Sequence, residues 1–158
     1  MRAATLALAL LAAPAGAGEA AWQIDVRAED VVAYLATPAA PARRVLLRCA
    51  RGAPGFLDLA VADGWFFAGV RPPALLLRPF TISALRLAVD DGGPRTFNAR
   101  YDRAARRYAT TLATDDPLVE RLMAGHRLEL DEPLAPGVAS LSLAGSRAAI
   151  TPLLAHCR

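Results

Sequence analysis

The sequence contains no lysine, only two histidines and only two cysteines among its 158 residues, and aromatic residues make up 6% of it. A metal site requires several ligands that converge, but His126 and His156 have no spacing that would bring them together on one helix or strand. The aspartate pairs at 90–91 and 115–116 occupy turn or helix-start positions, where aspartate serves local hydrogen bonding. We therefore expect no metal and no other cofactor.

Basic residues only slightly outnumber acidic ones. All 18 basic residues are arginines, against 15 acidic residues, and the formal net charge is +3. Without Arg2, near the N-terminus, the sequence has 17 arginines and 15 acidic residues. Nucleic-acid binding relies on a strong basic surplus. We expect no nucleic-acid partner.

The N-terminus has the features of a secretory signal peptide. Arg2 supplies a positive charge, and residues 3–13 form an apolar run. Ala15-Gly16-Ala17 matches the Ala-x-Ala cleavage pattern, and a second cleavage point follows Ala20. The apolar run is too short for a membrane span, which needs about 20 residues. A buried N-terminal helix is the alternative interpretation.

These features predict a signal peptide over residues 1–17 and a single β-rich domain over residues 18–158. We expect no transmembrane span in the mature protein. The predicted location is the periplasm or the extracellular medium.

Cys49 and Cys157 are predicted to form a disulfide, because two well-separated cysteines in an exported protein normally pair. A buried free thiol is one alternative. A Cys157 nucleophile activated by His156 is another, although adjacent residues on a helix point about 100° apart, which separates the imidazole from the thiol.

Apolar and polar residues alternate through most of the remaining chain, which is typical of strands with one buried face. Turn residues are expected to form a loop at 38–41, a hairpin turn at Asp63-Gly64 and a loop at 69–73. A change of phase near Ala84 predicts a bulge or break. The predicted strands cover 22–26, 31–37, 45–49, 57–61, 65–67, 75–90, 97–101, 108–112, 127–131 and 139–143.

Two helices are predicted. Asp116 can cap and Pro117 can open a short helix near 116–124, which Gly125 ends. Near the C-terminus, Ile150, Leu153, Leu154 and Cys157 form one helical stripe. Either Ser146 caps this helix and Pro152 lies inside it, or the helix begins at Thr151.

The predicted fold is mostly β, with a minor helical part. We expect an antiparallel β-sandwich or a barrel-like sheet, with the short helix near 116–124 and a C-terminal helix packed on the sheet.

A candidate interaction surface comprises Trp65 and the densest group of arginines, Arg100, Arg103, Arg106 and Arg107. These arginines could bind phosphate, lipopolysaccharide or an acidic protein. The alternatives are a solvated hairpin end for the arginines and a core position for the tryptophan.

The C-terminal third contains the segments LMAGHRL at 122–128 and SLSLAGSRAAI at 140–150. Together they resemble the end of the invasion-associated locus B family, small exported bacterial proteins that close with a strand and a Ser-Leu-x-Gly-x-x-x-Ala segment. The resemblance implies a periplasmic or surface protein connected with host interaction. It assigns no site residue.

The sequence contains no catalytic signature. Ser146 lies between a strand and a helix but not in a Gly-x-Ser-x-Gly motif, and a helix cap is the expected role. We therefore expect a non-enzymatic envelope protein that binds a protein or another envelope component. The alternatives are a small periplasmic hydrolase, using Ser146 or a carboxylate pair, and a carrier of a small apolar ligand.

Overall fold

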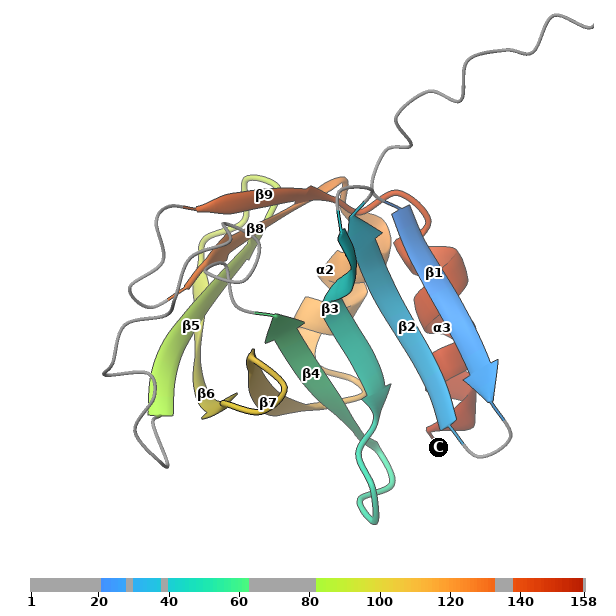
Figure 1. Ribbon diagram of the computed structural model, residues 1–158. Helices are drawn as coiled ribbons and strands as arrows, with labels where there is room; N and C mark the ends of the chain where they lie inside the picture. Colours follow the sequence, from blue (N-terminus) through green and yellow to red (C-terminus); the bar gives the residue numbers. More distant parts are fainter. Residues whose placement is uncertain (1–20, 28–29, 38–39, 63–81, 133–137, 158) are drawn as a thin grey trace, which may run out of the picture.

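The computed structural model describes residues 21–27, 30–37, 40–62, 82–132 and 138–157. Figure 1 shows a strongly curved antiparallel sheet that forms a nearly closed, barrel-like structure, with two helices beside it. The predicted fold class is confirmed. The strands are β1 (Ala21–Arg27), β2 (Asp30–Thr37), β3 (Ala40–Cys49), β4 (Phe56–Ala62), β5 (Ile82–Val89), β6 (Arg95–Asp102), β7 (Arg107–Ala113), β8 (Arg127–Asp131) and β9 (Ala139–Ser142), and the helices are α2 (Pro117–Ala124) and α3 (Ser146–His156).

The strand order is β1-β2-β3-β4-β7-β6-β5-β8-β9, and every neighbouring pair is antiparallel. The two edge strands meet at one corner, where the Trp22 amide donates to the Ala144 carbonyl at 2.9 Å, two residues beyond the end of β9. This bond joins the first strand to the chain that follows the last one, so the curved sheet almost closes on itself.

The interior of the sheet is filled with apolar side chains, as the alternation predicts. Leucines from β2, β3, β4, β5 and β8 are almost completely buried, and Tyr108 is the largest fully buried side chain. Tyr101 lies opposite it on β6, with the two ring centroids 5.0 Å apart. Helix α3 packs against β1, β2 and β3 and adds Ile150 and Leu153 to the same core.

Four expectations about strands need correction or fall outside the described residues. β3 begins at Ala40, so part of the predicted loop at 38–41 is strand. β5 pairs with β6 continuously across Ala84, and the predicted bulge there is wrong. Val26, near the end of β1, is 67% exposed, although Trp22 of the same strand is buried. Three predicted features lie outside the described residues: the hairpin turn at Asp63-Gly64, the strand at 65–67 and the loop at 69–73. Both edges of β4 are paired, one with β3 and the other with β7.

Helix α2 begins as its sequence predicts. Asp116 is the N-cap, and its carboxylate accepts a hydrogen bond from the Leu118 amide at 2.8 Å, while Pro117 opens the helix. The same carboxylate forms an ion pair with Arg95 of β6, whose guanidinium lies over the Phe97 ring. The cap therefore ties the helix to the sheet as well as starting it.

Asp116→Ala is expected to lower the free energy of unfolding by about 1 to 2 kcal/mol at neutral pH, the usual cost of a lost N-cap. Burial raises the pKa of Asp116, but the hydrogen bond from Arg95, the Leu118 amide and the charge of Arg95 together lower the pKa below its ordinary value. A lowered folded-state pKa gives stability that is present above the unfolded pKa and is lost as the pH falls through the folded one.

Urea unfolding at several pH values measures this effect. The difference between wild type and Asp116→Ala should be full at pH 7 and should shrink under strongly acidic conditions. Asp116→Asn, which keeps a capping oxygen but loses the charge, should fall between the two. An unchanged difference down to the lowest accessible pH would contradict the assigned role of the carboxylate.

The chain leaving α2 is held tightly against the end of β5. The Asp90 carboxylate accepts hydrogen bonds from the amides of His126 and Arg127 at 2.9 to 3.1 Å. A Cβ on Gly125 would lie 2.4 Å from the Val89 side chain and 2.9 Å from the Arg121 carbonyl oxygen. Glycine at 125 is therefore required by close packing, which gives a physical reason for this part of the LMAGHRL segment.

Helix α3 begins at Ser146 and contains Pro152, so the first of the two predicted arrangements is correct. The predicted cap is wrong, because Gly145 is the N-cap and no side chain caps the helix. Gly145 has a φ of 79°, a conformation that favours glycine. Among the described residues, no helix is both long and apolar enough to cross a membrane.

Candidate binding site

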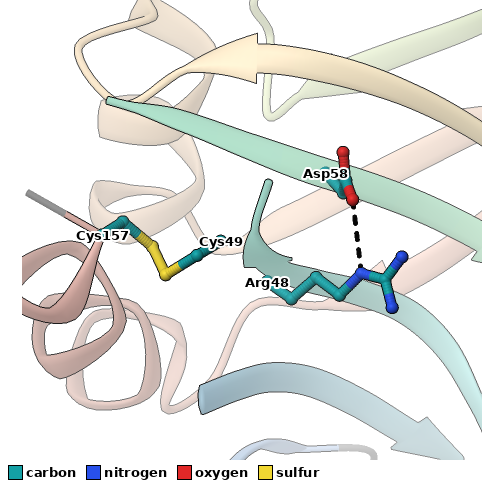
Figure 2. The surroundings of a disulfide bond; sticks show 4 residues. All are labelled: Arg48, Cys49, Asp58 and Cys157. Carbon is teal, nitrogen blue, oxygen red and sulfur yellow. Dashed lines mark hydrogen bonds and ion pairs between the residues drawn. A yellow bond between two sulfur atoms is a disulfide. The ribbon is translucent and has the colours of Figure 1, made fainter. Parts of the chain in front are cut away.

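A disulfide joins the end of β3 to the end of α3, as predicted. Cys49 and Cys157 are bonded, with their Cα atoms 5.2 Å apart and 108 positions apart in the sequence. The Gly55 amide also donates to the Cys157 carbonyl at 3.1 Å. Figure 2 shows that the preceding residue, Arg48, extends away from the disulfide toward Asp58. The same strand end therefore carries a covalent link on one side and a charged group on the other.

The outer face of the sheet is hollowed over β3, β4, β7 and β6. This hollow has a volume of about 740 Å³, which lies within the range of small-molecule binding sites. It lies on the face opposite the core, because alternate residues of a strand point to opposite sides. Its lining residues are Leu46, Arg48, Asp58, Ala60, Asn98, Arg100, Asp102, Ala105, Arg107, Ala109, Thr110 and Thr111. We call it the outer hollow.

The pairing register arranges the outer hollow in three rows that run across the strands. Small apolar side chains form the centre of the middle row, and polar side chains stand on both sides of it. This arrangement provides a shallow apolar floor with charged walls. The middle row is Leu46, Ala60, Ala109 and Arg100, and the flanking rows are Arg48, Asp58 and Thr111 on one side and Ala62, Arg107 and Asp102 on the other.

The acidic groups of the outer hollow are engaged by the protein itself. Asp58 accepts from Arg48 Nε at 3.3 Å and from Thr111 Oγ1 at 3.4 Å. Asp102 Oδ1 accepts from the amides of Ala104 and Ala105 at 2.9 and 3.0 Å, which shapes the turn between β6 and β7. Both carboxylates therefore have a structural role.

The arginines of the outer hollow are less fully engaged. Arg48 and Arg107 each use Nε for an internal bond, Arg107 donating to the Ala105 carbonyl at 3.4 Å. Arg100 is exposed, and its side chain forms no hydrogen bond or ion pair with any residue that the structure describes. Most of the hydrogen-bond donors on these three side chains face the hollow or the solvent.

The predicted interaction surface is thus divided by the structure. Arg100 and Arg107 lie on β6 and β7 and line the outer hollow, whereas Arg103 and Arg106 lie in the turn between these strands. Trp65 lies outside the described residues. Sequence analysis missed Arg48 and Asp58, although both alternate with core residues and were therefore predictable as outward-facing.

A second hollow of about 890 Å³ lies beside the start of α3 and includes His126, Ser142, Ser146 and Arg147. Ser146 and His126 thus share one hollow, which is the arrangement that a serine hydrolase would need. Ser146 is only 2% exposed, however, and its hydroxyl forms no hydrogen bond with His126. The hydrolase alternative gains no support from this geometry.

A third, smaller hollow of about 360 Å³ gathers acidic side chains at the end of β5, among them Asp90, Asp91, Glu129 and Asp131. Over the described ranges, no group of three or more residues has the geometry to hold a metal ion. Asp90 instead serves the chain after α2, and Asp131 forms an ion pair with Arg86.

One buried ion pair crosses the inside of the barrel. β3 pairs Val45 with Leu35 but Arg43 with Ala36, so Arg44 is the extra residue of a β-bulge. Bulges redirect side chains, and Arg44 is 4% exposed and bonds to Glu132 and to the Ala62 carbonyl. Glu132 follows β8, which is five positions away from β3 in the sheet order.

The sequence matches no protein-family model and no curated protein. Among solved structures, the crystal structure of invasion associated protein B from Bartonella henselae is similar, with a TM-score of 0.50 and 20% sequence identity. The alignment covers 87% of this chain and 94% of that chain. This chain has the fold of invasion associated protein B.

The similarity to invasion associated protein B agrees with the resemblance predicted from residues 122–128 and 140–150. The first segment contains the tightly packed Gly125, and the second contains β9 and the start of α3. Both segments build the corner where the sheet almost closes, so the resemblance has a structural basis. At 20% identity the similarity extends to the fold.

Proposed function

We propose that this chain is an exported, non-enzymatic protein of the bacterial envelope that acts by binding another envelope component at the outer hollow. In this proposal residues 1–17 are the signal peptide and residues 18–158 form the mature single-domain protein in the periplasm or outside the cell. The observation that carries the proposal is the outer hollow, a concave surface with an apolar floor and charged walls.

Two further observations support an exported binding protein. Disulfides persist in oxidising compartments such as the periplasm, and the disulfide here joins two distant parts of the chain. The similar solved structure is titled an invasion associated protein. A role in invasion or host interaction is accordingly the finer form of the proposal.

The outer hollow is a better candidate for binding than the barrel interior. Buried leucines and aromatic rings occupy the described interior, which gives no support to a carrier of a small apolar ligand. In the outer hollow, by contrast, guanidinium and carboxylate groups surround small side chains on rigid strands. Polar groups fixed on regular elements recognise partners with little loss of conformational freedom.

A photo-reactive residue at position 98 should crosslink to a specific envelope component in intact cells. Asn98 is exposed and lines the outer hollow, so a bound partner would lie within reach. A matched photo-reactive residue at the exposed Glu120 of α2 should give no such product. Ala109→Arg, which places a long side chain on the floor of the hollow, should reduce the crosslinked product at least about tenfold.

The crosslinked product from position 98 should decrease when unlabelled wild-type protein competes for the partner. Mass spectrometry should identify a single molecule in this product. Equal crosslinking from positions 98 and 120, or an undiminished product in Ala109→Arg, would rule out the outer hollow as the binding surface.

A further inference from the structure

We infer that the outer hollow is a phosphate-binding site, with the phosphate group held between Arg100 and Arg107 and the rest of the ligand lying over Ala60 and Ala109 toward Arg48. This inference rests on the proposed function and names the ligand chemistry that the hollow selects.

The register brings Arg100 and Arg107 close together. Arg100 pairs with Ala109 on β7, two residues along the strand from Arg107. One strand spacing and two residue steps separate the two Cα atoms by about 8 Å. Alternation places both side chains on the outer face, and both line the hollow. Two long side chains at this separation can hold one tetrahedral anion between them.

The unused donors of these arginines fit a phosphate group. Arg107 spends Nε on the Ala105 carbonyl, which leaves its two terminal nitrogens for a ligand. The Arg100 side chain has no bond to any described residue, and its whole guanidinium fork is available. Arginine forks bind phosphate oxygens with two parallel hydrogen bonds. Two forks that approach from different sides can each bind different oxygens of a tetrahedral phosphate monoester, which has three terminal oxygens where a planar carboxylate has two.

The nearby acids offset only part of the arginine charge, because Arg48, Arg100 and Arg107 line the hollow with Asp58 and Asp102 as its two acids. Asp102 lies opposite Arg107 in the register, yet its Oδ1 is bonded to the amides of Ala104 and Ala105. Asp58 is bonded to Arg48 and Thr111 in the far row. A phosphate monoester carries a charge of about −1.5 to −2 near neutral pH, and it would complete the charge balance of the hollow.

The middle row indicates where the rest of the ligand lies. Ala60 is 7% exposed beside Leu46, and Ala109 packs against the same cluster. Both residues present only methyl groups, so the floor between the charged rows is low and apolar. Arg48 stands at the far side of this floor, and its Nε bond to Asp58 fixes its position while leaving both terminal nitrogens unused by that bond. These groups suit a phosphorylated polar molecule or lipid headgroup that extends across the sheet.

Titration with inorganic phosphate, followed by amide shifts in NMR spectra, tests the inference on the mature protein. Binding should shift the amides of β6 and β7 around Arg100 and Ala109. Arg100→Gln should weaken the binding about tenfold or more, the effect of one lost charged hydrogen-bond pair. Arg147→Gln removes the same charge from the exposed face of α3 and should change the affinity less than about twofold.

A second variant, Asn98→Asp, controls for a folding defect in Arg100→Gln. It keeps every arginine but adds a negative charge to the hollow, and it should also weaken phosphate binding. Both altered residues are exposed, so unfolding curves should match wild type. The inference would be overturned if wild type bound neither a free phosphate ester nor a phosphate-bearing lipid. An equal loss of phosphate affinity in Arg100→Gln and Arg147→Gln would also overturn it.

Two ligand forms distinguish the source of the phosphate. Glycerol phosphate in solution tests a free phosphate ester, and phosphatidylcholine vesicles with or without phosphatidic acid test a lipid headgroup. Binding of either form that depends on Arg100 supports the inference. Crosslinking from position 98 that persists in Arg100→Gln, with no phosphate binding, would retain the proposed function and reject the phosphate site. Phosphate binding without crosslinking would do the reverse.

Discussion

The Cys49→Ala/Cys157→Ala double variant is expected to lose about 4 to 5 kcal/mol of its free energy of unfolding. The disulfide closes a loop between residues 108 positions apart. In the chain-entropy description, removing a crosslink over about 100 residues costs this amount, because the unfolded chain regains its freedom. Small domains have a total stability of about 5 to 15 kcal/mol, so the variant should be marginally folded at best.

The position of the bond adds a structural reason for a large effect. α3 packs against β1, β2 and β3 and against α2, and its end is held by Cys157. Without the bond, the helix keeps only its packing through residues such as Ile150 and Leu153. We expect α3 to open first in hydrogen exchange of the variant, ahead of the strands.

Urea unfolding with and without reductant measures the effect. Wild type should be strongly destabilised by reductant, and the double variant should be insensitive to it. Alanine replaces both cysteines in this variant so that no hydroxyl is buried at the 5% exposed position 157. A loss below about 1 kcal/mol would contradict the assigned role and would mean that noncovalent packing alone holds α3.

The bond also touches the outer hollow, because Arg48 directly precedes Cys49 and points to the other side of β3. The end of β3 is held by the pairing of Cys49 with Leu57 on β4 and by the covalent link to α3. Reduction would therefore loosen one wall of the hollow while leaving Arg100 and Arg107 in place. The sulfur chemistry of the compartment and the binding surface are physically connected at this strand.

Local sequence patterns were sufficient to predict the elements that depend on neighbouring residues. The alternation around Val45, Leu47 and Cys49 predicted the strand at 45–49, and Asp116 with Pro117 marked the start of α2. The cysteine pairing followed from composition and compartment. For the strand and the helix a single local rule, either side-chain alternation or helix capping, decides the structure.

Features that depend on distant pairing could not be predicted. The partners of β4 are β3 and β7, and β7 begins 45 positions after Ala62. Nothing in the alternation of β4 specifies which strand lies at its second edge. The outer hollow combines residues from four strands, so only Arg100 and Arg107, which one hairpin brings together, were visible as a group.

Strand irregularities also depend on distant pairing, as the regular β5 at Ala84 and the bulge at Arg44 show. A change of apolar phase suggested an irregularity at Ala84, but regular pairing with β6 holds β5 straight there. The real bulge occurs at Arg44, where the sequence shows only consecutive arginines before Val45. Arg44 bonds there to Glu132, a residue after β8 that no pattern around Arg44 indicates.

The ion pair between Arg44 and Glu132 is expected to give the second large effect. Glu132→Gln should lower the free energy of unfolding by about 3 to 5 kcal/mol, because it removes the negative charge that faces the buried guanidinium of Arg44. The side chains are 4% and 2% exposed, so water cannot replace the lost partner. Arg44→Met should cost a similar amount by removing the guanidinium that bonds to the buried carboxylate.

A double-mutant cycle separates the pair from its parts. Arg44→Met combined with Glu132→Leu removes both charges and replaces them with apolar side chains, which in buried sites is often neutral or stabilising. We expect the double variant to be more stable than either single variant by about 2 kcal/mol or more. Urea unfolding of all four proteins gives the coupling energy. A double variant no more stable than the singles would show that the bulge itself needs the arginine.

The cycle also tests what selects the position of the bulge. Arg44 bonds to the Ala62 carbonyl at the end of β4 as well as to Glu132, so it joins β3, β4 and the end of β8 at one point. With both charges removed, the bonds that favour the bulge at position 44 are absent, and we expect β3 to return to regular pairing with β2 there. That change would shift the backbone pairing of β3 with β2 by one residue before Val45, and altered amide shifts along β2 and β3 would reveal it.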